Sequence, residues 1–430
     1  MSDPLTQNRM PQLCIYPKRW RIAALLSTGI AIFYFDRQTL GVALKSIEQT
    51  IPISPEQYGW LTSAFLITYA FAYVAAGKLL DTLGTRRGFF IMVLCWAAAC
   101  ASHGLATTFS MLLMSRLFLG IGEGGGFPAA SKAIAEWFPS SERSTAMGII
   151  NAGSAVGGVI AAPGIALILA LAKWPWVFFT AALTGILWTA WWLIDYRFPK
   201  QSSPRDERNE LLPSSSEQPI PWCALLRYRQ LWALMSAKFL TDAAWFFYVF
   251  WLPKYLYSER GFDIKSMGCF AWIPFAAAGF GCLAGGGASS FLMHRGVSLD
   301  RARKLIMGLS AALMPFILFT TASPIAIAIG LFALAYFGHQ AWSTLLITLP
   351  ADIFPRSTVG SVAGMVGFGG AMGGVVFNLL VGYMLGHGFE FKHIFMISGT
   401  LHVIGFGLVL LGIRKIQPLT FSPGSVMASS

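Results

Sequence analysis

The chain has 430 residues, of which 55% are hydrophobic and only 12% are charged, and its mean hydropathy is +0.61. This composition excludes an ordinary soluble domain. The formal net charge of +12 would suit a protein that binds nucleic acid, but the placement of the charges along the chain argues against that function.

Apolar runs long enough to cross a bilayer recur along the whole chain. The first run is too long for a cleavable signal peptide and lacks a small-residue cleavage site, so we expect it to stay in the membrane. The sequence predicts an all-α membrane protein with twelve spans, at residues 21–44, 57–79, 88–106, 110–134, 144–171, 176–196, 231–256, 266–293, 304–321, 324–348, 358–386 and 391–413.

The basic residues are distributed unevenly over the predicted loops. Of the 31 lysines and arginines, the loops on one side hold only Lys45, Lys173, Lys254, Arg260, Lys265 and Lys392. This is the positive-inside bias, and it predicts that both termini are cytoplasmic. The basicity therefore sets topology and does not indicate a nucleic-acid partner.

The first span contains the run Tyr34-Phe-Asp36-Arg37, which places charge inside an apolar helix. Arg37 is suited to a carboxylate ligand because its planar fork can donate two hydrogen bonds. Asp36 is a candidate proton acceptor. The alternative is a self-neutralising pair tucked between helices.

The loop between the second and third spans reads Gly77-Lys-Leu-Leu-Asp81-Thr-Leu-Gly84-Thr-Arg86-Arg87. It resembles the cytoplasmic latch motif of the major facilitator superfamily, in which this loop holds one conformation. Gly84 is expected to turn the chain, Asp81 to cap or pair between halves, and the arginines to stay at the headgroups. A basic turn that only anchors topology is the alternative.

The fourth predicted span carries Arg116 and Glu123, seven residues apart in a glycine-rich run. Seven residues is about two helical turns, so both side chains lie on nearly the same face, about 10 Å apart along the axis. A lone charge at bilayer depth costs roughly 2.5 to 3.5 kcal/mol. The pair is therefore a candidate device for moving an anion with a proton, although a purely structural ion pair is possible.

The chain reads as two similar halves joined by a polar linker rich in Ser and Pro. At a shift of 216 residues, Phe138-Pro139 falls on Phe354-Pro355, and four glycines coincide as well: Gly148, Gly153, Gly157 and Gly158 fall on Gly364, Gly369, Gly373 and Gly374. The predicted organisation is a tail (1–20), a six-helix bundle (21–196), a linker (197–230), a second bundle (231–414) and a tail (415–430). Parallel six-helix repeats are the build of major facilitator transporters, which bind substrate at the midplane between halves.

The same shift places Glu123 on His339, so the second half has its own ionisable residue at the equivalent depth. His339 and Gln340 are therefore candidates for polar contacts with a substrate. Tyr69 and Asn378 are single polar residues in apolar spans, and each is about as suited to joining helices as to touching a substrate.

The sequence gives little support to a metal site, a nucleotide-binding site or an enzyme active site. Lys238 and Asp242 stand one turn apart in the seventh span, and a local salt bridge is the favoured interpretation. The six cysteines have no metal-ligand spacing, and no nucleotide-binding motif or cofactor site is found, so neither an enzyme nor an ATP-driven pump is indicated.

Residues 20–415 are similar to the anion:cation symporter branch of the major facilitator superfamily, which includes bacterial hexuronate and galactonate transporters. The likeness rests on the Tyr-x-Asp-Arg run, on Arg116-x6-Glu123-Gly, and on Phe239-Leu-Thr-Asp with Trp251-Leu-Pro-Lys-Tyr. It implies that Asp36 and Glu123 carry protons and that Arg37, Tyr34 and Tyr69 line a sugar-acid site.

The resemblance thus predicts proton-coupled import of a hexuronate or related sugar acid by a monomer in a bacterial inner membrane. Two alternatives stay open. One is a symporter of the same build for phosphate or another organic anion, with sodium as a possible coupling ion. The other is a non-transporting membrane sensor.

Overall fold

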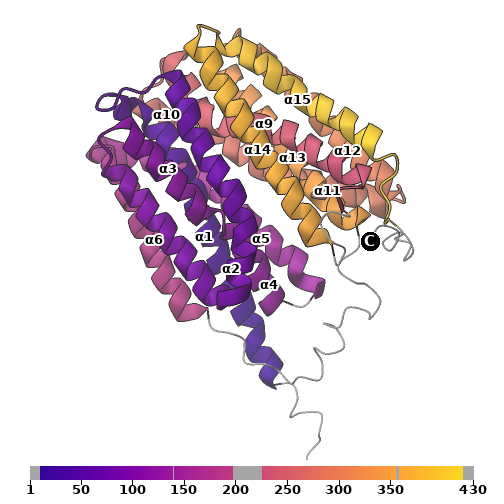
Figure 1. Ribbon diagram of the computed structural model, residues 1–430. Helices are drawn as coiled ribbons and strands as arrows, with labels where there is room; N and C mark the ends of the chain where they lie inside the picture. The colour runs from indigo at the N-terminus through magenta and orange to yellow at the C-terminus, as the bar shows by residue number, and fades with distance from the viewer. Residues whose placement is uncertain (1–9, 139, 197–224, 355–357, 420–430) are drawn as a thin grey trace, which may run out of the picture.

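The computed structural model describes residues 10–138, 140–196, 225–354 and 358–419 (Figure 1). Within these ranges it does not describe the side chains of residues 10–17, 77, 78, 81, 135, 140–145, 359 and 360. The described residues form helices and turns, with no strand among them. We refer to residues 10–196 as the N-terminal half and to residues 225–419 as the C-terminal half.

The helices of the N-terminal half are α1 (Met10–Glu48), α2 (Pro55–Gly104), α3 (Phe109–Glu123), α4 (Gly126–Trp137), α5 (Ser140–Leu171) and α6 (Pro175–Asp195). The first helix begins eleven residues before the predicted first span and takes in part of the predicted tail. A long helix, α2, covers the second and third predicted spans, because it runs through a kink at Gly84, where φ is +76°. Only glycine adopts this backbone geometry without strain, and the kink lies where the sequence predicted a turn.

The helices of the C-terminal half are α9 (Arg229–Ser258), α10 (Ile264–Phe270), α11 (Ile273–His294), α12 (Leu299–Leu313), the short 3₁₀ helix η1 (Met314–Phe319), α13 (Ile325–Ile353), α14 (Val359–Gly386) and α15 (Phe391–Gly412). The chain after α15 packs back on this half, where the Leu419 amide donates to the Ile353 carbonyl at 2.8 Å.

Nine stretches among the described helices are long and apolar enough to cross a membrane. They coincide with nine of the twelve predicted spans. The three other predicted spans are α1, α3 with α4, and α9. These are the segments that carry the intramembrane charges, and α3 and α4, with 15 and 12 residues, are each too short to cross a membrane alone.

The predicted span 110–134 is not one continuous helix. It breaks at Gly124 and Gly125, directly after Glu123. A side chain at Gly125 would place its Cβ 1.9 Å from the Met92 sulfur, so Met92 would have to move to admit it. The break therefore puts Glu123 at the C-terminal end of α3 rather than inside a regular helix.

Each half packs by the same rule. A Cβ at Gly153 or Gly157 of α5 would lie 2.2 Å from a backbone carbonyl of α1, at Ser27 or Ala31. At the repeat-related positions of α14, a Cβ at Gly369 or Gly373 would lie 3.1 or 1.9 Å from a backbone carbonyl of α9. The glycine pattern found at a shift of 216 residues therefore marks equivalent close helix contacts in the two halves.

Among the described helices the halves meet mainly along four pairs: α2 with α14, α5 with α10, α5 with α11, and α1 with α9. In Figure 1 the purple and orange bundles converge toward the top of the view and diverge toward the chain ends. Helices α1, α2 and α5 of the N-terminal half and α9, α10, α11 and α14 of the C-terminal half thus lie where the two halves face each other.

Candidate functional site

Arg37 occupies a cage of aromatic rings in the N-terminal half. Its guanidinium carbon lies 4.7 Å from the ring centre of Tyr34, 4.8 Å from Tyr69 and 5.5 Å from Phe65. Arginine stacks well on such rings because it is planar and only weakly hydrated. The cage therefore fixes the direction in which Arg37 can present its donors.

The partner of Arg37 is Glu123, whose Oε1 accepts from the arginine Nε. The side chains are 6% and 0% exposed, so this ion pair is shielded from water. The second carboxylate oxygen of Glu123, Oε2, is buried without a hydrogen-bond partner. The sequence predicted both residues as functional but did not predict that they pair with each other.

Asp36 points away from Arg37 into a separate polar pocket. Its carboxylate accepts hydrogen bonds from Trp96 Nε1 at 3.0 Å, from the Cys100 thiol at 3.1 Å and from the Thr39 hydroxyl at 3.4 Å. The side chain has no solvent exposure. These donors stabilise the ionised carboxylate without a counterion in direct contact, whereas burial favours its protonated form.

Arg116 of α3 is a further buried cation in the N-terminal half. It is 2% exposed, and its Nε and Nη2 atoms have no hydrogen-bond partner. Asp36 and Glu123 are both within its electrostatic range. The structure thus brings together the three residues predicted for proton coupling, and Arg116 is the cation that either acid can use.

The predicted substrate residues of the C-terminal half have partners of their own. His339 stacks on Trp245 with ring centres 4.6 Å apart, and its Nδ1 lies 2.9 Å from Nε2 of His402. Asn378 accepts from Trp251 Nε1 and donates to the Gly374 carbonyl, both at 2.7 Å. Both residues are buried. Gln340 is half-buried.

A further charged pair lies in the C-terminal half, where the sequence predicted a local salt bridge. Lys238 and Asp242 of α9 are joined at 2.8 Å and are 8% and 7% exposed. Asp242 lies within electrostatic range of Tyr34 and Tyr69, two rings of the Arg37 cage in the other half. Spacing alone could not reveal this placement; the one available signal was charge in an apolar span.

The predicted latch is only partly described. Gly84 forms the kink, Arg86 donates to the Leu193 carbonyl at 2.5 Å, and Arg87 is exposed. The side chain of Asp81 and the surroundings of Gly77 lie outside what the structure describes. The predicted pairing of Asp81 therefore stays a prediction.

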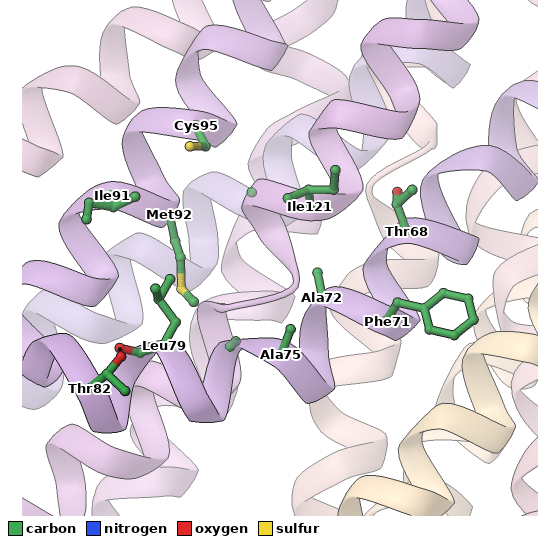
Figure 2. Close-up of a pocket in the computed structure, with 12 residues that line it drawn as sticks. Thr68, Phe71, Ala72, Ala75, Leu79, Thr82, Ile91, Met92, Cys95 and Ile121 are labelled. Atoms are coloured by element: carbon green, nitrogen blue, oxygen red, sulfur yellow. Dashed lines mark hydrogen bonds between the residues drawn. The ribbon is translucent and has the colours of Figure 1, made fainter.

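An apolar crevice of about 700 Å³ opens between the two limbs of α2 and α3. Figure 2 shows Met92 and Leu79 pointing toward one another into it. Its lining residues carry no charge, so it cannot hold an anion. Among the described residues no group of three His, Cys, Asp or Glu side chains could bind a metal ion.

The comparisons with known proteins agree with this architecture. The sequence profile of the Major Facilitator Superfamily matches residues 26–377. The chain belongs to the Major Facilitator Superfamily.

Relatives within the superfamily are close enough to align over most of the chain. A hexuronate transporter of Escherichia coli (strain K12) is 31% identical over 93% of this chain and 95% of its own length. A galacturonate transporter of Dickeya chrysanthemi is 32% identical over 69% of this chain and 89% of its own.

A solved bacterial homologue of the lysosomal transporter Spinster shares the fold, with a TM-score of 0.73 at 17% identity, covering 93% of this chain and 97% of its own. The protein is thus a multi-pass, all-α superfamily transporter, not an enzyme.

Proposed function

We propose that this superfamily member imports a hexuronate or a related sugar acid, such as glucuronate, galacturonate or galactonate, by proton symport with alternating access. The names of the aligned relatives support the substrate class. The observation that carries the proposal is the caged Arg37–Glu123 ion pair, because it links an anion site to a proton site in one contact.

The coupling follows from the chemistry of that pair. While Glu123 is ionised, it occupies the guanidinium and repels an incoming carboxylate. A proton on Glu123 removes its charge, so Arg37 loses its partner and can donate to the carboxylate of a substrate. Anion binding therefore requires prior protonation, and release of the proton on the other side returns Arg37 to Glu123 and expels the anion.

Asp36 and Arg116 supply a second step in this cycle. Arg116 has free donors and reaches both acids electrostatically. When Glu123 is protonated, the ionised carboxylate of Asp36 can offset the positive charge of Arg116. When Asp36 is protonated instead, Arg116 can stabilise the ionised carboxylate of Glu123. The two acids therefore need not be ionised at the same time.

The contacts between the halves support alternating access. Tyr58 donates to the Phe250 carbonyl at 2.5 Å, and Ser63 to the Val375 carbonyl at 3.1 Å. Further contacts on the same face join Tyr257 to Val42, Lys254 to Glu48 and His387 to Glu56. These contacts close the face opposite the chain ends. With both termini cytoplasmic in a bacterial inner membrane, that face is periplasmic and the site opens inward.

The test is Glu123→Gln in proteoliposomes, which keeps the shape of the side chain and removes its charge. We expect exchange of internal for external galacturonate or glucuronate to persist, and accumulation driven by a pH gradient to be lost. Glu390→Gln is the matched control, because Glu390 is an exposed acid paired with Lys392 at the surface.

Loss of exchange with retained accumulation would contradict the assignment of the proton to Glu123. Accumulation of these sugar acids that follows a sodium gradient instead of a pH gradient would favour the sodium-coupled alternative. Flux of phosphate without flux of any sugar acid would overturn the substrate class while leaving the fold in place.

A further inference from the structure

We propose that Lys238 and Asp242 form the half-site in the C-terminal half that binds the hydroxyl groups of the substrate, and that this pair selects hydroxylated acids over plain carboxylates. This inference rests on the proposed function, since it completes the site that Arg37 begins. It adds a role to the local salt bridge that the sequence predicted and that the structure shows at 2.8 Å.

The pair has hydrogen-bonding capacity left over. Lys238 donates to Asp242 at 2.8 Å and to the Ser343 hydroxyl of α13 at 3.3 Å, which uses two of its three donors. Asp242 can accept up to about four hydrogen bonds, and Lys238 provides one. A free donor next to free acceptors suits a pair of neighbouring hydroxyl groups, because each hydroxyl both donates and accepts.

Stability does not account for the pair. An ion pair one turn apart on a helix contributes only about 0.2 to 0.5 kcal/mol in the open. In a buried setting, removing both charges from water costs more than a hydrophobic pair of the same size would. Lys238 and Asp242 lie deep in a membrane helix, where ionisable residues mark substrate or ion pathways.

The backbone of α14 holds the pair in place. A Cβ at Gly370 would lie 2.3 Å from Oδ2 of Asp242 and 2.9 Å from Cγ of Lys238. Glycine therefore lets α14 press against one side of the pair. The Lys238–Asp242 geometry is constrained from this side and from Ser343, which is what a binding half-site needs.

The helix that carries the pair touches the anion site of the other half, because Phe250 of α9 packs edge-on against Phe65 of the Arg37 cage with ring centres 6.3 Å apart. Asp242 is within electrostatic range of Tyr34 and Tyr69, whose rings cage Arg37. Trp245 follows Asp242 by three residues and Lys238 by seven, so the three side chains share one face of α9. A molecule with a carboxylate at one end and hydroxyls along its length can therefore bridge the halves. A plain carboxylate would reach only the N-terminal half.

The experiment compares two probes, galacturonate and hexanoate, which have the same charge and differ in their hydroxyl groups. Competition against radiolabelled galacturonate exchange is measured in proteoliposomes for the parent protein, for Asp242→Asn and for the double variant Lys238→Gln with Asp242→Asn. Asp300→Asn is the matched control, because Asp300 pairs with Lys304 at the same spacing and 2.7 Å, outside the site.

We expect both variants to need about tenfold to hundredfold more galacturonate for half-saturation, the effect of losing a hydrogen bond to a charged group. Competition by hexanoate should be unchanged, which also shows that the variants are folded. The control should match the parent protein for both probes.

Equal weakening of both probes would overturn the selectivity role, and so would unchanged galacturonate affinity in both variants. If the parent protein itself neither exchanges galacturonate nor binds hexanoate, the proposed function fails instead. The two failures are therefore distinguishable.

Discussion

At the scale of single residues, the arrangement of Arg37 decides what the site can do. The guanidinium is stacked between Tyr34 and Tyr69 and bonded to Glu123, so its position, its direction and its counterion are all determined. A point charge of the same sign would satisfy the ion pair. A lysine ammonium would not stack on the two rings as the planar guanidinium does.

We therefore expect Arg37→Lys to raise the half-saturating concentration of galacturonate by about tenfold or more, from the loss of stacking and of the two-pronged hydrogen bond. Uptake kinetics in proteoliposomes measure this. Arg295→Lys is the control, because Arg295 also stacks on a ring, that of Phe291, but is exposed. Parent-like kinetics in the Arg37 variant would show that the stacking has no role in binding.

At the scale of elements, α3 is clamped between the two limbs of α2. A Cβ at Gly120 would lie 2.2 Å from the Thr68 hydroxyl and 2.3 Å from the Phe65 carbonyl on the first limb. A Cβ at Gly122 would lie 2.5 Å from the Trp96 backbone nitrogen on the second limb. These glycines bring α3 close enough for Glu123, at its end, to reach Arg37 on α1.

Gly120→Ala should destabilise the protein by about 1 to 3 kcal/mol, because backbone must move to admit the methyl group. It should also weaken proton-driven accumulation, since α3 carries Glu123. Gly330→Ala on α13 is the control: nothing lies within 4 Å of its added Cβ, so we expect no loss of stability. Thermal unfolding of both purified variants gives the comparison, and equal midpoints would contradict the packing argument.

At the scale of the whole molecule, the two halves are joined at the face opposite the chain ends by hydrogen bonds to backbone carbonyls. Tyr58 and Ser63 of α2 reach across to Phe250 and Val375 of the other half. Both donors are fully buried. Each such bond contributes only about 0.5 to 1.5 kcal/mol, so the closed face can open in the transport cycle.

Removing one of these bonds should shift the balance toward opening. In a background without native cysteines, Val42→Cys reports on this face, because the residue is buried between the halves while the face is closed and contributes only its backbone carbonyl to the contact with Tyr257. We expect Tyr58→Phe to increase maleimide labelling of that cysteine about fivefold, the equivalent of about 1 kcal/mol.

Tyr248→Phe is the control for this shift, since Tyr248 donates to Ser398 within one half, at 3.3 Å. Equal labelling in the two tyrosine variants would mean that the Tyr58 bond does not hold the face closed.

Much of this architecture follows from the order of the residues. Apolar length defines most of the membrane helices, and the glycines that recur after 216 residues mark the equivalent packing of α5 on α1 and of α14 on α9. Charge in an apolar span is costly wherever it occurs, so Asp36, Arg37, Arg116 and Glu123 stand out without any knowledge of contacts.

Which of these charged residues contact each other was decided by the tertiary structure alone. Arg37 and Glu123 are 86 positions apart, and their contact depends on how α1 is rotated against α3 and on the helix break after Glu123. The sequence predicted substrate contacts for His339 and Asn378, and the structure adds that each also has a partner in its own half, so their contact with a substrate stays a prediction. The sequence suggested only a local salt bridge for Lys238 and Asp242, because they stand one helical turn apart. Only the approach of the two halves shows that their helix, α9, packs against the cage of Arg37, since helix rotation and the contact between halves are not encoded in spacing along one chain.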